Sequence, residues 1–205
     1  MSLKLSDYKY IIGTGHPPVD AKWYREMIAI HHVEQYMEDE DEYGPNHPLR
    51  TTIIPSMKAE IVDVINGVHP NKTANPGGYG SAMMDDYYNH MRKFSNFSVP
   101  DVKNADTPKI QDLACFKYPN LVNRLAEGYK YAVMIEEYLK DMSKYGSKHP
   151  IRVKIFPYLT SRLRTCMDKE TEPGEVEDIV YELSFCWSVM KTWDEYHTYK
   201  PISPP

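Results

Sequence analysis

Cysteine is scarce in this sequence, and the cysteines present do not fall into pairs. The chain has three, Cys115, Cys166 and Cys186, and none of them stands in a Cys-x-x-Cys spacing. An odd count argues against a disulfide framework, and the missing paired spacing argues against a zinc knuckle. We therefore expect all three to be small buried residues rather than nucleophiles or metal ligands.

Long apolar runs and basic clusters are also missing. No apolar stretch approaches the roughly 18 residues that a membrane-spanning helix needs. No group of Lys and Arg marks a face for nucleic acid, and the formal net charge is −5. The first ten residues lack the apolar core of a signal peptide. We expect an intracellular protein, cytoplasmic or organellar, with no membrane span and no nucleic-acid partner.

The residues used most freely are ones that suit buried protein–protein surfaces. The chain has 17 Tyr, 16 Pro and 11 Met. Tyr buries a large ring while keeping a polar tip, and Met adapts its shape to a partner. Many of these residues will fill the core of the protein itself. Their number nevertheless favours a protein that binds other protein chains.

One stretch of the sequence occurs twice, 102 residues apart. Without gaps, residues 34–61 and 136–163 share ten identities in 28 positions, and several other aligned pairs keep apolar character. The identities include the pattern Tyr-Gly-x-x-His-Pro-aliphatic-Arg, followed each time by x-x-Ile-x-Pro. We interpret this as an internal duplication of two three-helix units, which predicts an all-α bundle.

Apolar residues at spacings of three and four predict helices along most of the chain. In the first half we expect helices over 21–43, 52–66 and 81–94, and in the second half over 119–145, 153–169 and 175–196. Residues 1–18 and 198–205 are rich in Gly or Pro and predict extended arms. The expected organisation is an arm (1–18), a first helical repeat (19–95), a linker (96–117), a second helical repeat (118–197) and a Pro-rich tail (198–205).

The repeated turn allows a structural and a functional interpretation. Gly44 and Gly146 suit the end of a helix, and the prolines that follow suit an extended connector and a new helix start. Arg50 and Arg152 are placed to reach the carbonyl groups at the end of the preceding helix. The functional interpretation is two copies of a cluster that binds an anion or a partner chain. Its members are Tyr43, His47, Arg50, Tyr145, His149 and Arg152.

The two arms carry aromatic and aliphatic residues without helical periodicity. Their low periodic content predicts that they do not fold against their own bundle, and Pro-rich segments lose little entropy on binding. We therefore expect them to lie along neighbouring chains. The expected anchors are Tyr8, Tyr10, Tyr199 and Ile202.

Carboxylates on two successive helices give an alternative, enzymatic interpretation. Glu34 and Glu38 are followed 22 residues later by Glu60-Ile-Val-Asp63. Over residues 26–66 this resembles the all-α nucleotide pyrophosphohydrolases of the MazG and dimeric dUTPase type. Their pattern is E-x-x-E on one helix and E-x-x-D on the next, holding magnesium against a triphosphate. The resemblance implies Mg²⁺-dependent dNTP hydrolysis with Glu34, Glu38, Glu60 and Asp63 as ligands.

Two further patterns carry less chemistry. His31 and His32 stand near Glu34 on one helix, as a carboxylate–imidazole metal site requires, but the second repeat has Met134 at the position of His32. The Gly-rich stretch 75–81 precedes a helix but lacks the Gly-Lys-Ser/Thr ending of a phosphate-binding loop. The sequence therefore favours a non-catalytic helical scaffold subunit without a cofactor, and the magnesium-dependent hydrolase is the alternative.

Overall fold

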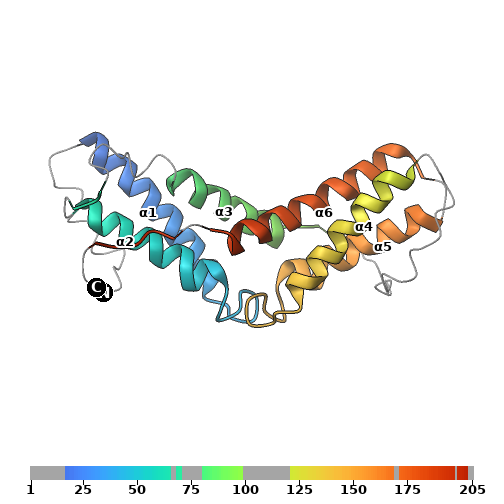
Figure 1. The fold of residues 1–205 in the computed structure, drawn as a ribbon, viewed down its shortest axis with the longest axis horizontal. Coiled ribbons are helices and arrows are strands. Elements are labelled where there is room, and N and C mark those ends of the chain that lie inside the picture. Colours follow the sequence, from blue (N-terminus) through green and yellow to red (C-terminus); the bar gives the residue numbers. More distant parts are fainter. Residues whose placement is uncertain are drawn as a thin grey trace. The chain divides into compact units, whose positions relative to one another are not determined.

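The computed structural model describes residues 17–65, 68–70, 80–98, 121–168, 171–196 and 198–202. Over these residues the predicted all-α class is confirmed: the regular elements are six α-helices and two π-helical segments, and the β-structure is one isolated bridge (Figure 1). The described residues divide into two compact units. Unit 2 holds Asp41–Gly44 and the residues from Phe94 to Glu195, and unit 1 holds the rest.

Unit 1 is formed by α1 (Pro17–Met37), η2 (Leu49–Ile53), α2 (Ile54–Ile65) and α3 (Gly80–Ser95) up to Lys93. Its core follows from the helical spacing of apolar residues, because positions three and four apart lie on one face. The rings of His32 on α1 and Tyr88 on α3 lie 5.0 Å apart, which places these helices together. The buried core residues include Met27, Ile30, Val33, Met37, Met57, Ile61, Met84, Tyr87 and Met91.

Unit 2 packs α4 (Val122–Leu139), η5 (Ile151–Ile155), α5 (Phe156–Asp168) and α6 (Pro173–Asp194). Gly128 on α4 makes the close approach of three helices possible. A Cβ at this position would lie 3.1 Å from Val180 Cγ2 on α6 and 3.2 Å from Leu163 Cδ1 on α5. Cys166 and Cys186 are buried in this unit, as expected, and Cys115 lies outside the described residues.

Both π-helical segments end two residues before a proline. Pro55 is the second residue of α2, and Pro157 is the second residue of α5. A proline inside a helix lacks an N–H and clashes with the carbonyl four residues earlier. The wider π turn makes room for that ring, and its i−5 bonds are seen where Ile54 N bonds Leu49 O and Phe156 N bonds Ile151 O.

The helices begin and end at other residues than the sequence suggested. The first helix ends at Met37 and α4 ends at the equivalent residue, Leu139, so neither helix continues to the Tyr-Gly turn that follows it. The chain becomes helical again at Leu49, well before Pro55, which we expected to restart it. Among the described residues, no helix has the length and apolar character needed to cross a membrane.

Candidate functional site

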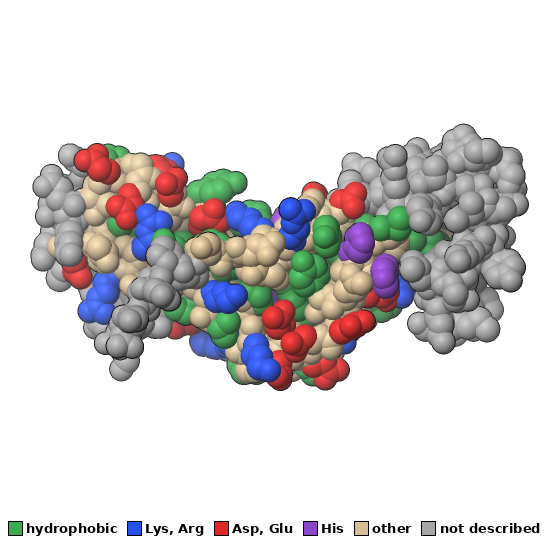
Figure 2. All heavy atoms as spheres, turned by 180° about the vertical axis from the view of Figure 1, so that it is seen from behind, with side chains coloured by type: hydrophobic (Ala, Val, Ile, Leu, Met, Phe, Trp, Pro, Cys, Tyr) green, Lys and Arg blue, Asp and Glu red, His purple; other side chains and the backbone are tan. Residues whose placement is uncertain are grey.

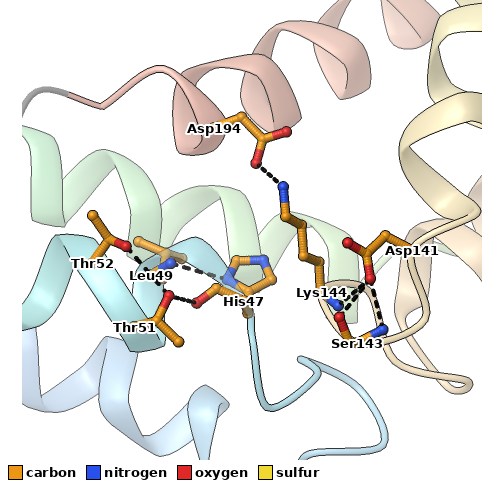
Figure 3. A network of polar contacts seen from close by, with 8 residues as sticks. All are labelled: His47, Leu49, Thr51, Thr52, Asp141, Ser143, Lys144 and Asp194. Carbon is orange, nitrogen blue, oxygen red and sulfur yellow. Dashed lines mark hydrogen bonds and ion pairs between the residues drawn. The ribbon is translucent and has the colours of Figure 1, made fainter.

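The two histidines of the repeated turn act as helix caps. Leu49 N donates to His47 Nδ1 at 3.2 Å (Figure 3), and Ile151 N donates to His149 Nδ1 at the same distance. Both rings are fully buried. Burial, assisted by the nearby Arg152 charge, lowers the pKa of His149 from 6.5 to about 3. His149 is therefore neutral at ordinary pH, as an acceptor nitrogen must be.

The two arginines satisfy carbonyl groups at the end of the preceding helix, as predicted. Arg50 donates to Met37 O, and Arg152 donates to Leu139 O, the equivalent residue 102 positions later. Arg152 also donates to Tyr145 O at 2.7 Å and to Gly146 O at 3.1 Å. One guanidinium thus holds both the helix end and the turn that follows it.

The segment Asp41–Gly44 packs into unit 2 against the second turn. Tyr43 and Tyr145 form an antiparallel β-bridge, and Gly44 N donates to Lys144 O at 3.1 Å. Tyr43 is fully buried, with its ring 4.8 Å from that of His149. Glycine is required here, since a Cβ on Gly44 would lie 2.0 Å from the backbone oxygen of Ser143.

Asp141 and Lys144 fix the second turn through polar contacts (Figure 3). Asp141 Oδ1 accepts bonds from Ser143 N at 3.0 Å, Ser143 Oγ at 2.6 Å and Lys144 N at 3.2 Å. These donors, the Ser143 hydroxyl most of all, lower the pKa of the Asp141 carboxyl. Lys144 Nζ donates to Asp194 Oδ1 at 2.9 Å, which ties the turn to the end of α6.

The repeated turn thus lies in the interior of this chain, in agreement with the structural one of the two interpretations of the sequence. Tyr43, His47, Tyr145 and His149 have no exposed surface in this chain, and the two arginines are bonded to backbone carbonyls. The same bonds occur at both places, 102 residues apart. Internal duplication is our interpretation of this match.

The four carboxylates of the enzymatic alternative differ in their burial and in the partners they bond. Glu34 Oε1 pairs with Lys58 Nζ, and Glu60 Oε1 lies 3.2 Å from His69 Nε2. Glu38 is exposed, while Asp63 is fully buried. Across the described residues there is no group of three or more His, Cys, Asp or Glu side chains that could hold a metal ion, and this applies to His31 and His32 too.

Asp63 on α2 instead holds the segment that follows α6. Tyr199 Oη donates to Asp63 Oδ2 at 2.8 Å, and Ile202 N donates to the same oxygen at 2.7 Å. A buried carboxylate is costly without donors, so these two bonds compensate for the burial of its charge. We call residues 198–202 the tail segment.

Two more residues complete the contact with the tail segment. Ser56, which is 7% exposed, bonds both the backbone N–H and the backbone carbonyl of Tyr199 through its hydroxyl. The ring of His69 stacks on that of Tyr199, with centroids 5.3 Å apart and planes within 11°. Ser56, Asp63 and His69 form what we call the tail-binding site. It recognises two side-chain groups and three backbone groups of an extended segment.

The surroundings of Tyr199 keep its hydroxyl protonated, so that it can donate a hydrogen bond. Desolvation, the bond to Asp63 and the nearby charge of Glu60 raise its pKa from 10.0 to about 12. A negative phenolate beside two carboxylates would be repelled. The contact therefore depends on the protonated phenol and persists over the whole neutral range.

The tail segment binds Asp63 of its own chain, and its anchoring on a neighbouring chain stays a prediction. Tyr199 and Ile202 were expected to anchor on a neighbouring chain, yet both bond to Asp63 of their own chain. The tail segment is not helical, and a buried carboxylate supplies an attraction that needs no apolar periodicity. Tyr8 and Tyr10, the anchors expected in the other arm, lie outside the described residues, as does most of the Gly-rich stretch 75–81.

Sequence reasoning missed the tail-binding site, although a signal for it was present. Asp63 stands in the middle of the apolar stretch Ile61-Val-Asp-Val-Ile65. A carboxylate at a core position of a helix must find donors, since unpaired buried charges are strongly disfavoured. That signal points to a buried acceptor. It does not reveal that the donors come from more than 130 residues away.

The charge pattern of the surface and the comparisons with known proteins say little about what the tail-binding site binds. On the face shown in Figure 2, side chains of both charge signs are interspersed among the described residues. No protein-family model matches this chain, and no curated protein or solved structure was found to be similar to it. The function must therefore be argued from the site itself.

Proposed function

We propose that this protein is a non-catalytic helical interaction subunit, and that its tail-binding site is a receptor for an extended segment of protein chain. The observation that supports the proposal is the fully buried Asp63 carboxylate with its two donors from residues 199 and 202. Charge-assisted bonds of this kind are among the stronger ones in proteins. The ligand class is a short extended segment with a tyrosine and, three positions on, a free backbone N–H.

Main-chain bonds and one side-chain anchor are a recognised way of binding extended peptides. Here Ser56 bonds the backbone at residue 199, and His69 presents a flat ring to the tyrosine. The tyrosine hydroxyl supplies specificity, because a phenylalanine at this position would leave Asp63 with one donor fewer. Such a site binds and does not transform its ligand.

A labelled peptide tests the proposal in the intact chain. The peptide covers residues 198–205, and the receptor carries Tyr199→Phe and Ile202→Pro, which remove both donors of its own tail segment. We expect the receptor to bind the peptide at least about tenfold more tightly than the wild type does, because in the wild type the attached tail competes at an effective concentration near the millimolar range. Fluorescence anisotropy measures this directly.

Two controls make the result specific. The receptor with Asp63→Leu added should lose the binding, and the receptor with Glu38→Gln added should keep it, because Glu38 is exposed. Circular dichroism checks that each variant keeps its helices. Equal peptide affinity in the wild type, the receptor and the Asp63→Leu receptor would overturn the proposal.

A further inference from the structure

The tail segment is bonded to one unit and covalently attached to the other. Its partners Ser56 and Asp63 lie on α2 of unit 1, whereas the helix that precedes it, α6, belongs to unit 2. The residues between Asp194 and Tyr199 that the structure describes are not helical. An element linked to its neighbours by a non-helical connection and held by local bonds is the kind that identical protein chains exchange.

An empty tail-binding site lacks two bonds to the Asp63 carboxylate. If the tail segment leaves, Asp63 loses the bonds from Tyr199 Oη and Ile202 N, and bonds to a charged group are each worth about 1.5–3 kcal/mol. The donors of any second copy are chemically identical to those that left. A reciprocal exchange between two copies preserves every one of these bonds.

Apolar surface also stays uncovered beside the site. Val68, whose N–H bonds the backbone oxygen of Asp63, is 42% exposed, and the side chain of Ile202 is 56% exposed. Both residues are thus bonded to Asp63 while their aliphatic groups face solvent. A second copy that arrives with its tail segment brings surface that can cover them.

We propose that the tail segment is exchanged reciprocally between two copies of this chain, so that Tyr199 of each copy bonds Asp63 of the other. The proposal rests on the tail-binding site being a receptor, as argued above. In the exchange, the tail segment that occupies the site comes from a second copy of the same chain. The dimer forms at the expense of the intramolecular contact, so its population rises with protein concentration.

A complementing pair of variants of the intact chain tests the exchange. One variant, Tyr199→Phe with Ile202→Pro, has an intact site and a disabled tail segment. The other, Asp63→Leu, has an intact tail segment and a disabled site, and Asp63→Asn serves in its place if the Leu variant is poorly folded. Mixed together, they should form a one-to-one complex, measured by native mass spectrometry with one variant isotopically labelled.

The control mixture combines the Asp63→Leu variant with a triple variant that carries all three substitutions. We expect at least about tenfold more heterodimer in the complementing pair than in this control, as the loss of a bond to a charged group implies. Equal heterodimer in both mixtures, or none up to millimolar concentration, would overturn the exchange. If the peptide of residues 198–205 still binds the receptor, the proposed function stands without it. If neither associates, both proposals fall.

Discussion

At the scale of single residues, the repeated motif shows why each side chain is needed. His149 accepts a bond from Ile151 N while fully buried, and that role requires a neutral ring. Its lowered pKa means that the unfolded chain binds a proton below pH 6.5 where the folded chain does not. Protonation therefore favours unfolding, and the stability that His149 contributes is present above pH 6.5 and is lost as the pH falls towards 3.

Replacing His149 by asparagine should make the protein less sensitive to acid. Asparagine keeps a side-chain acceptor for Ile151 N but does not titrate. We expect the free energy of unfolding of the wild type to fall relative to that of His149→Asn by up to about 1.4 kcal/mol per pH unit below about pH 6.5. Urea denaturation at a series of pH values measures this difference. A constant difference between about pH 7 and about pH 4 would contradict the assignment.

Replacing Gly44 should be poorly tolerated even when the new residue is as small as alanine. An alanine Cβ would collide with the backbone of Ser143, which cannot move aside as a flexible side chain can. We expect Gly44→Ala to destabilise the protein by at least about 2 kcal/mol. Gly174→Ala is the matched control, because its Cβ would meet no atom within 4 Å. Similar thermal midpoints for the two variants would show that the close approach is not required.

Deprotonation of Tyr199 at alkaline pH should weaken binding to the tail-binding site. Its pKa is raised to about 12 by its surroundings, while a free tyrosine titrates near 10.0. The bound state therefore keeps the proton longer, so its advantage is complete below pH 10 and is lost as the pH approaches 12. The affinity of the 198–205 peptide should fall by up to about tenfold per pH unit in that range. A peptide with Phe at position 199 should lack this dependence, and an equal loss by both peptides would contradict the assigned bond.

At the scale of elements, the helices could be predicted from apolar periodicity, and so could the role of the arginines. The helix ends were less predictable, because they depend on interactions that a local pattern does not contain. Both α1 and α4 end before the Tyr-Gly turn that follows each of them, and the π turns before Pro55 and Pro157 let helix form upstream of a residue that normally marks a helix start. The tail-binding site was unpredictable for a stronger reason, since its donors and its acceptor lie far apart in sequence.

Replacing Arg152 tests how much side-chain capping stabilises the end of α4. It bonds three carbonyl groups at the end of α4 and in the turn that follows. Arg152→Met keeps the aliphatic stem and removes these donors, so we expect a loss of about 1–3 kcal/mol in the free energy of unfolding. Arg124→Met removes two ion pairs from the surface and should change stability little. Equal effects of the two substitutions would contradict a capping role.

At the scale of the whole molecule, two segments contribute to the unit that does not contain their neighbours. Asp41–Gly44 packs in unit 2 while α1 before it belongs to unit 1, and the tail segment packs in unit 1 while α6 before it belongs to unit 2. Each is fixed by a specific requirement: a glycine at a close approach in the first case, and a buried carboxylate in the second. The proposed function depends on the second segment, because its bonds define the ligand.

A double-mutant cycle tests the central claim, that Asp63 recognises the tyrosine hydroxyl of an extended segment. The affinity of the 198–205 peptide is measured for Tyr and for Phe at position 199, against the tail-disabled receptor and against the same receptor carrying Asp63→Asn. If the two groups are bonded, the loss on removing the hydroxyl should be at least about fivefold larger with Asp63 present. Losses that are the same in both receptors, within the roughly twofold error of such cycles, would show that the bond between Asp63 and Tyr199 does not carry recognition.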